Sequence, residues 1–372
     1  MFALRGVGYK LWRFNVFSVY PPLIPLPRTF GRLDTQLATD RQGSTMSSVA
    51  SPRGSNQDGS IEPYLVISEQ DDSIYWLEYL PDGQWIVTGS LRGGVVKVWN
   101  LESGKQEGAL IEHSHINGLA VTRDGTKIIT NDYEDDRDDE KLRMWDVASH
   151  KLIKEWSHPG GCFSIAISPD DQFIAGGGWN IAIWTMEGRL VNSIEVQVGD
   201  GDDTSISIWS MCFSPDGKKL ACSTNDDIRV YDVNSGTLIA VLSLDGDRLF
   251  NVLWSRDGSK LFASPGGTIQ CWNSDTGQQI GHPWTGHTGA ICSLSLSPDG
   301  SILASASFDH TVHFWNATTG DPIGQHLQHD DGVRTVHFSP SKIYIWRVDC
   351  LGQCQTSNFK YVFPVLACST MI

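Results

Sequence analysis

The sequence predicts an all-β protein of seven similar units arranged as the blades of a propeller, and two repeated features predict it. A short turn, Pro-Asp-Gly or a near copy, recurs along the 372 residues at intervals of 41 to 46 residues. After each turn, a strand-like segment ends in an aromatic residue. Periods of this length mark stacked units that cannot bury their apolar faces alone. Each unit is therefore expected to pack against the next one.

The turns mark corresponding points in the units. Their first residues are Pro81, Arg123, Pro169, Pro215, Arg256 and Pro298. A seventh turn is due near residue 340, where the chain reads Ser339-Pro340-Ser341 and lacks the Asp-Gly. Asp and Gly suit tight turns, because Asp bonds to its own backbone and Gly accepts a positive φ.

A strand with one buried face precedes every turn. The residues two and four positions before the first turn residue are apolar in all seven units. These pairs are Leu77/Tyr79, Leu119/Val121, Ile165/Ile167, Met211/Phe213, Val252/Trp254, Leu294/Leu296 and Val336/Phe338. Alternation with a period of two indicates a strand that is buried on one side.

A later strand of each unit ends in an aromatic residue, which in most units is followed by Asp or Asn. The closing aromatics are Trp99, Trp145, Trp184, Tyr231, Trp272, Trp315 and Trp346. A polar turn and a fourth short strand follow, as at residues 237–242. Four antiparallel strands per unit are typical of a propeller blade.

On these motifs the chain resembles the WD40-repeat family over roughly residues 61–349. The unit that starts at Gly286 carries the family pattern nearly whole, as GHTGAICSLSLSPDGSILASASFDHTVHFWN. The resemblance implies a buried hydrogen-bond relay in this unit, formed by His287, Ser307, Asp309 and Trp315. The other units retain less of it, although His158 and His329 stand at the matching distance before their turns.

The seventh unit is too short for four strands. Trp315 and Trp346 are 31 residues apart, whereas the other closing aromatics are 39 to 47 residues apart. We expect a truncated seventh blade that lacks one strand.

The family resemblance implies that an N-terminal strand completes this blade, and residues 61–68 are the candidate. Residues 359–366 are apolar and could supply the missing strand, although Pro364 opposes a central position. The alternative, which we favour slightly, is that the tail at 350–372 is an aberrant end.

The N-terminal 60 residues differ from the rest. Residues 1–33 carry five basic and no acidic residues, which fits a mitochondrial presequence, but four prolines oppose the helix that such a signal needs. An initiation at Met46 is the favoured alternative. Residues 43–60 are rich in Ser, Gly, Asn and Gln and are expected to be disordered. The expected domains are thus a disordered segment at 1–60, a propeller at 61–349 and a tail at 350–372.

The composition excludes several functions. Formal charge is −15, and residues 34–372 hold 23 basic against 43 acidic residues, so direct nucleic-acid binding is not expected. No run approaches the roughly 20 apolar residues of a membrane span. Eight cysteines, most of them inside predicted strands at unrelated unit positions, indicate a reducing compartment. We expect a cytoplasmic protein, with the nucleus as a further possibility.

No catalytic, cofactor or metal motif is present. The sequence lacks GxSxG, HExxH, P-loop and GxGxxG patterns. The acidic clusters at 134–140 and 200–203 coincide with the longest turn intervals and are interpreted as loop insertions. The pairs His113/His115 and His326/His329 lack a third ligand nearby. We therefore expect no enzyme, no cofactor and no metal.

A protein-binding face is predicted at the start of the innermost strands. Aromatic residues and Arg dominate binding energy at interfaces. The candidate face consists of Tyr75, Trp209, Arg248, Phe250 and Arg334. The competing interpretation is that Phe163, Trp209 and Phe250 extend the apolar column between blades.

The predicted function is a non-catalytic scaffold or adaptor that binds other proteins. The alternatives are a divergent propeller enzyme with its site in the central channel, and an RNA- or chromatin-associated subunit. The Trp-Asp-x-Arg motif, which this family uses to dock onto a cullin-type ubiquitin ligase adaptor, is absent, since Trp145-Asp146 is followed by Val-Ala.

Overall fold

The protein is described here by a computed structural model. It describes residues 45–48, 65–68, 74–90, 94–103, 105–111, 115–133, 139–159, 161–196, 207–224, 227–243, 249–340, 344–349 and 354–358. All of these residues fall within one compact unit, 44–372. They form strands and the turns between them, and this part of the chain contains no helix. For β1, β2, β28 and β29 only the backbone path is described.

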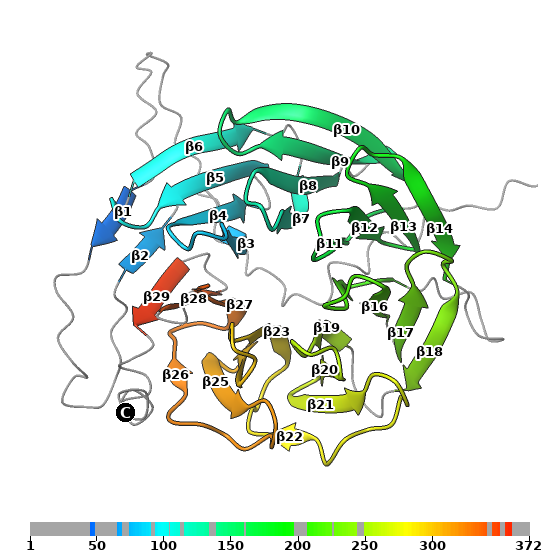
Figure 1. Ribbon diagram of the computed structural model, residues 1–372. Coiled ribbons are helices and arrows are strands. Elements are labelled where there is room, and N and C mark those ends of the chain that lie inside the picture. Colours follow the sequence, from blue (N-terminus) through cyan, green and yellow to red (C-terminus); the bar gives the residue numbers. More distant parts are fainter. Residues whose placement is uncertain are drawn as a thin grey trace, which may run out of the picture. The chain divides into compact units, whose positions relative to one another are not determined.

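Six four-stranded antiparallel sheets form the blades of the propeller (Figure 1). Blade one contains β3 (Ile74–Tyr79), β4 (Trp85–Ser90), β5 (Val95–Asn100) and β6 (Lys105–Ile111). Blade two contains β7 (His115–Val121), β8 (Lys127–Tyr133), β9 (Asp139–Asp146) and β10 (Lys151–Pro159). Blade three contains β11 (Ser164–Ile167), β12 (Phe173–Gly177), β13 (Asn180–Thr185) and β14 (Leu190–Glu195).

The other three blades follow the same plan. Blade four contains β15 (Ser210–Phe213), β16 (Lys219–Ser223), β17 (Asp227–Asp232) and β18 (Leu238–Ser243). Blade five contains β19 (Leu249–Trp254), β20 (Lys260–Pro265), β21 (Thr268–Asn273) and β22 (Trp284–Thr285). Blade six contains β23 (Ile291–Leu296), β24 (Ile302–Ser307), β25 (Thr311–Asn316) and β26 (Leu327–Gln328).

The predicted all-β propeller is confirmed, but the predicted count of seven such blades is wrong. The described residues form six four-stranded blades and one five-stranded sheet. That sheet has the order β1 (Thr45–Ser48), β2 (Leu65–Ser68), β29 (Cys354–Asn358), β28 (Tyr344–Asp349) and β27 (Val333–Phe338). It therefore combines strands from both ends of the described chain.

The five-stranded sheet differs from the truncated blade that the sequence predicts. The strand that holds Trp346 pairs directly with β27, with Phe338 opposite Ile345, so it takes the second position rather than the third. β29 pairs with β28 and with β2, so it fills the position that the shortened unit left empty. Residues 359–366, the predicted source of that strand, lie outside the described residues. β1 lies within the segment 1–60 that the sequence predicts to be disordered, and it pairs with β2, whose open edge offers backbone hydrogen-bond partners.

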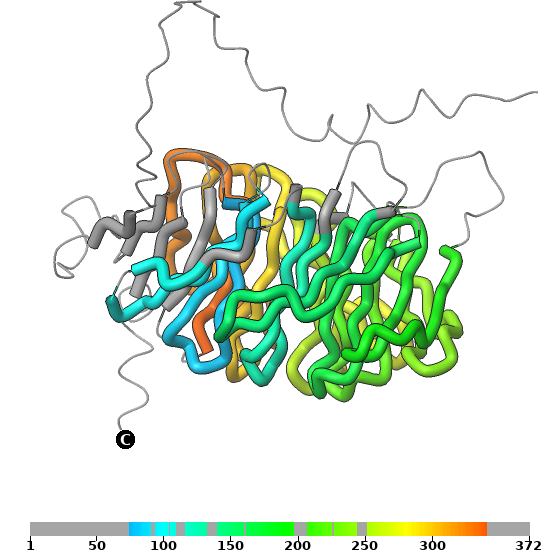
Figure 2. Tube along the Cα trace, turned by 90° about the horizontal axis from the view of Figure 1, so that it is seen from above, coloured from blue at the N-terminus to red at the C-terminus, as the bar shows by residue number. Residues whose placement is uncertain are grey.

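The innermost strands are arranged in a circle around the centre of the molecule (Figure 1). In order they are β3, β7, β11, β15, β19, β23 and β27, and each contacts the next. β27 also contacts β3, so this inner circle of strands is closed. Figure 2 shows the same sheets from the side, standing next to one another. The seam between β27 and β3 is the junction between the end and the start of the repeats.

The core lies between neighbouring blades rather than at one centre. One cluster joins Val87 and Val98 of blade one to Leu119 and Trp145 of blade two, and similar clusters follow around the ring. The apolar residue four positions before the turn is buried in six of the seven units. Burying one such side chain contributes about 1.5–3 kcal/mol. Blades therefore stabilise one another, as expected for stacked units.

The turns have the geometry that the sequence predicts. In blade two the amide of Gly125 donates to the carbonyl of Thr122 over 2.9 Å, and Gly125 has φ +70. The hydroxyl of Thr122 donates to the carboxylate of Asp124 over 2.6 Å. Blades three to six carry a Ser–Asp pair at the same place, each at 2.6 Å. The turn carboxylates are therefore held inside their own turns.

Candidate functional site

A hydrogen-bond relay crosses blade six. His287 lies before β23, and its Nδ1 is 2.8 Å from Oδ2 of Asp309, which lies between β24 and β25. Its Nε2 is 2.7 Å from Oγ of Ser305 in β24. The indole Nε1 of Trp315 in β25 donates to the same Oγ over 2.8 Å. The relay thus ties the loop before the blade to its two central strands.

The aspartate of this relay accepts further hydrogen bonds. Its oxygens also accept from the amide of Thr288 at 2.9 Å and from the hydroxyl of Thr311 at 2.5 Å. Burial raises the pKa of Asp309, but the hydrogen bonds from Thr311, Thr288 and His287 outweigh it and bring the pKa to about 2. Burial lowers the pKa of His287 despite the neighbouring carboxylate. Both side chains are almost fully enclosed, so they lock the fold and do not meet a ligand.

The serine of the relay is Ser305, and the expectation of Ser307 is wrong. Ser307 donates instead to the carbonyl of Gly289 over 3.1 Å and accepts from the amide of Asp309 over 3.1 Å. Both serines lie in β24, two residues apart. In the strand register Leu303 is opposite Trp315, which places Ser305 nearer to the indole than Ser307. Ser307 stands at the end of the strand, where it supports the loop.

Other blades keep only part of the relay. In blade one the indole of Trp99 donates to Thr88 over 2.8 Å, and in blade two that of Trp145 donates to Thr130 over 2.9 Å. In blade three Gly176 takes the corresponding place, and a Cβ there would lie 2.7 Å from Cδ2 of His158. A glycine is therefore needed for the buried imidazole to fit. These blades depend more on apolar packing than blade six does.

A column of histidine rings lies beside the relay. The ring centroids of His287 and His313 are 4.1 Å apart, and those of His313 and His326 are 5.1 Å apart. Burial and the nearby imidazoles lower the pKa of His313 to about 4. Within the described part of the chain, no group of three or more His, Cys, Asp or Glu side chains is placed to hold a metal ion.

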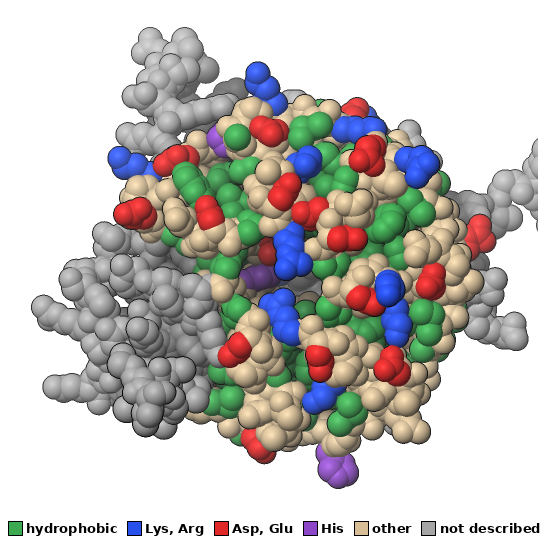
Figure 3. Space-filling model, in the orientation of Figure 1, with side chains coloured by type: hydrophobic (Ala, Val, Ile, Leu, Met, Phe, Trp, Pro, Cys, Tyr) green, Lys and Arg blue, Asp and Glu red, His purple; other side chains and the backbone are tan. Residues whose placement is uncertain are grey.

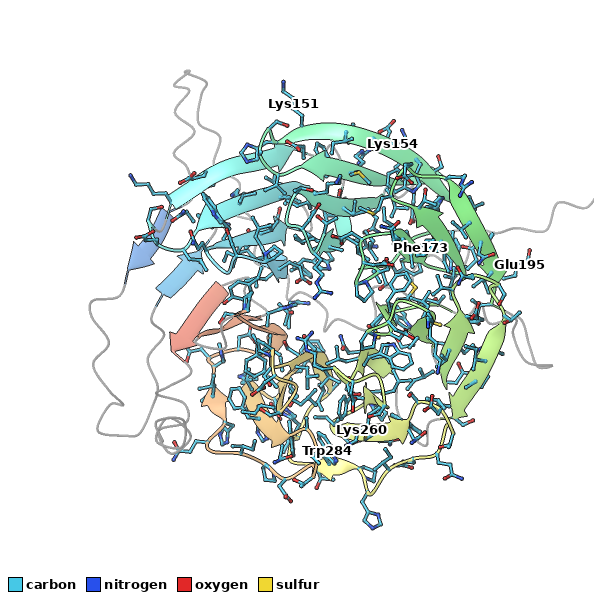
Figure 4. All side chains as sticks on the ribbon, in the orientation of Figure 1. Lys151, Lys154, Phe173, Glu195, Lys260 and Trp284 are labelled. Atoms are coloured by element: carbon cyan, nitrogen blue, oxygen red, sulfur yellow. The ribbon has the colours of Figure 1, made fainter. Side chains whose placement is uncertain are left out.

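A tryptophan pair and a glycine fix the contact between blades five and six. Trp284, labelled in Figure 4, has its ring centroid 6.0 Å from that of Trp315 and 5.7 Å from that of Phe262. Gly320 has φ +80, and a Cβ there would lie 2.2 Å from the indole nitrogen of Trp284. The side chain of blade five thus extends over blade six.

The predicted partner face divides into two described groups. Cζ of Arg334 in β27 lies 4.4 Å from the ring centroid of Tyr75 in β3, a cation–π contact across the seam. Trp209 stacks on Phe163 with a centroid distance of 6.2 Å and an interplanar angle of 22°. Arg248 lies outside the described residues, and the side chain of Phe250 does too. The structure therefore locates three of the five predicted residues.

An exposed tryptophan extends the second group, and the sequence prediction missed it. Trp179 follows β12 and is 49% exposed. Its ring centroid is 5.9 Å from that of Phe163, and the two rings are nearly perpendicular. We call Trp209, Phe163 and Trp179 the aromatic row. The predicted face was confined to the innermost strands and so did not include Trp179, although a Trp after Gly176-Gly177-Gly178 is an unusual turn residue that could have indicated it.

Two further observations limit the chemistry of the described residues. Burial raises the pKa of Cys222 to about 12 and that of Cys271 to about 11, so these thiols stay protonated at neutral pH. No helix long and apolar enough to cross a bilayer occurs in the part of the chain that the structure describes.

Comparison with known proteins agrees with the repeat and the fold. Residues 61–100, 150–185, 194–232 and 277–316 match the family model "WD domain, G-beta repeat". The chain is 26% identical to meiotic recombination protein rec14 of Schizosaccharomyces pombe, over 50% of this chain and 62% of that protein. It is 24% identical to WD repeat-containing protein 82 of Drosophila melanogaster, over 74% and 87%. It is 25% identical to guanine nucleotide-binding protein subunit beta of Oryza sativa subsp. japonica, over 65% and 80%.

The matches are similarities of repeat and fold. The chain spans less than two thirds of the length of several relatives that it matches, rec14 among them. The repeated turns, the four-stranded blades and the four matched stretches agree with one another. The chain thus carries WD40 repeats and folds as a β-propeller.

Proposed function

We propose that this protein is a non-catalytic scaffold that binds other proteins through the face at which its innermost strands begin. The observation that carries the proposal is the aromatic row, in which an exposed Trp179 is held rigidly by Phe163 and, through it, by Trp209. Rigid aromatic groups that are already partly exposed bind partners with little loss of side-chain entropy. The ring of packed blades supplies the fixed support.

The names of the relatives support a role within assemblies. One is named as a subunit of a guanine nucleotide-binding protein and another as a transcriptional corepressor. Propellers also host enzymes, so the fold alone does not decide between a scaffold and an enzyme. In favour of a scaffold, the best-connected polar groups, His287 and Asp309, are enclosed in the blade and bonded to each other.

We further propose that the five-stranded sheet takes the place of one more blade and closes the ring. The contact of β27 with β3, the ring of Tyr75 beneath Arg334, and the ring of Pro340 against Gly83 all support closure. A closed ring covers the apolar faces of the first and last blades, which an open ring would expose to water. On this proposal the propeller extends beyond 61–349, from residue 45 to residue 358.

The experiment compares two exposed apolar positions. Trp179→Ala removes the outer ring of the aromatic row, and Ile239→Ala removes a 47% exposed side chain from the outer strand β18 as the matched control. Each variant is immobilised as the full chain and incubated with lysate, and captured proteins are quantified by mass spectrometry. We expect the first variant to lose a defined set of partners at unchanged thermal stability, and the control to keep them. Equal capture by all three proteins would contradict the proposal.

A further inference from the structure

A carboxylate lies next to the exposed end of the aromatic row. Glu140 is the second residue of β9, and only 8% of its surface is exposed. Its Oε2 accepts a hydrogen bond from the amide of Cys162. A Cβ at Gly161 would lie 3.6 Å from Oε1 of Glu140 and 3.6 Å from two carbons of the Trp179 ring. The carboxylate and the exposed indole therefore flank the same glycine.

The chain just before the aromatic row is held in place by side chains of blade two. Besides the bond from its amide to Glu140, Cys162 accepts a hydrogen bond at its carbonyl from the side-chain amide of Asn131 in β8. Cys162 is fully buried, and Gly161 has φ +76. The peptide that leads into Phe163 is thus fixed on both sides. A site that is already ordered binds a partner with a smaller loss of entropy.

The rings of the row present their faces in two directions. Trp179 is inclined by 87° to Phe163, whereas Phe163 is inclined by only 22° to Trp209. The face of an aromatic ring is electron-rich and attracts a cation, most strongly when the ring is Trp. The charge of Glu140 adds to this attraction, because water screens a buried carboxylate less than an exposed one. The combination favours a positively charged group at Trp179.

The chain segments next to the row in sequence are acidic. Residues 134–138, which join β8 to β9, contain four acidic residues and one basic residue. Residues 197–206, which lead toward Trp209, contain three acidic residues and no basic one. On the face shown in Figure 3, by contrast, acidic side chains are interspersed with Lys and Arg. A concentration of negative charge attracts cationic partners and repels acidic ones.

We propose that the aromatic row and Glu140 bind an arginine side chain in a basic segment of a partner protein. The inference rests on the proposed function and adds the chemistry of the partner. A guanidinium group stacks on aromatic faces, pairs with carboxylates and is more weakly hydrated than the ammonium group of lysine. An apolar side chain could contact the ring of Trp179 but would bring no charge to Glu140.

The test measures binding of a fluorescein-labelled peptide to the full chain by fluorescence anisotropy. The peptide consists of Gly and Ser with two arginines. The control peptide carries citrulline at both arginine positions, because citrulline has nearly the same shape and no charge. We expect the arginine peptide to bind and the citrulline peptide to bind at least about tenfold more weakly.

Two variants separate the charge from the ring. Glu140→Gln removes the charge and keeps an oxygen for the amide of Cys162, and Trp179→Leu removes the aromatic face and keeps an apolar group. Each should weaken binding of the arginine peptide by roughly five- to tenfold. The matched controls are Glu195→Gln in β14, labelled in Figure 4, and Ile239→Ala in β18. Both positions are exposed on outer strands, and neither change should alter binding.

Three outcomes would overturn the inference: no binding at millimolar peptide, equal binding of the two peptides, or arginine binding that both variants leave unchanged. If Glu140→Gln lowers the melting temperature, the citrulline comparison tests the charge in its place. Trp179 is half-exposed, so Trp179→Leu tests the ring without disturbing the core. If Trp179→Ala loses captured partners while the arginine peptide does not bind, only this inference fails. If the peptide binds as expected while capture is unchanged, only the proposed function fails.

Discussion

The charge of Asp309 is expected to hold blade six together, and Asp309→Asn tests this while preserving the shape of the side chain. The pKa of this carboxyl is about 2, against an ordinary value of 3.8. A difference of that size corresponds to roughly 2 kcal/mol, since one pKa unit is about 1.4 kcal/mol. Because the folded-state pKa is lowered, this stabilisation is complete above pH 3.8 and is lost as the pH falls through about 2.

The assay is urea unfolding followed by tryptophan fluorescence, at pH 7 and at steps down to pH 2. We expect the variant to be less stable than the original chain by roughly 2 kcal/mol at pH 7, with the difference closing toward pH 2. Asp275→Asn is the control, because this carboxylate is 79% exposed and pairs only at the surface with Lys219. A loss that is equally large at pH 2 and at pH 7 would show that the charge is not responsible.

Three further predictions concern the relay, the seam and the last sheet. Ser305→Ala removes the acceptor of Trp315 and the partner of His287, so it should cost about 2 kcal/mol in urea unfolding, more than Ser307→Ala. Burial raises the pKa of Glu78, which faces His337 at 3.8 Å, so its destabilising effect grows as the pH rises through that pKa. Glu78→Gln should therefore raise the melting temperature at pH 8 but not at pH 4, and the opposite order would refute this. Deleting residues 350–372 removes β29, and limited proteolysis with intact-mass analysis should then show cleavage at the exposed sheet; an unchanged fragment pattern would contradict its role.

Most of the propeller could be predicted from the sequence, because its determinants are local. The positive φ of Gly125 and the hydrogen bond between Thr122 and Asp124 depend only on residues that are close together in the sequence. The alternation that ends at Leu77 and Tyr79 gives the buried face of a strand directly. Each of these signals recurs in the other units at a similar spacing. A unit in which one signal is missing can therefore still be recognised from its neighbours.

The parts that could not be predicted depend on contacts between distant residues. Ser305 and Ser307 lie two residues apart in one strand, and only the register with β25 decides which meets the indole. The place of β28 in its sheet depends on pairing with β29, and that of β29 on pairing with β2. No local pattern encodes such a register. Trp179 was not predicted for a related reason. Its place in the aromatic row depends on its contact with Phe163, which the sequence does not show.

The pairing of β2 with β29 also determines when this protein can finish folding. Leu65 lies opposite Thr356 in that pair, so almost the whole described chain separates the two strands. During synthesis, domains fold from the N-terminal side as the chain emerges. The blades can stack in turn while the ribosome advances, but the two terminal strands meet only after translation has reached the last of them. The loop-closure entropy of so long a segment opposes this final step, and contacts of such high sequence separation form slowly. The nascent propeller is thus an open arc with two unpaired edges for most of its synthesis, and that arc is the form on which chaperones would act.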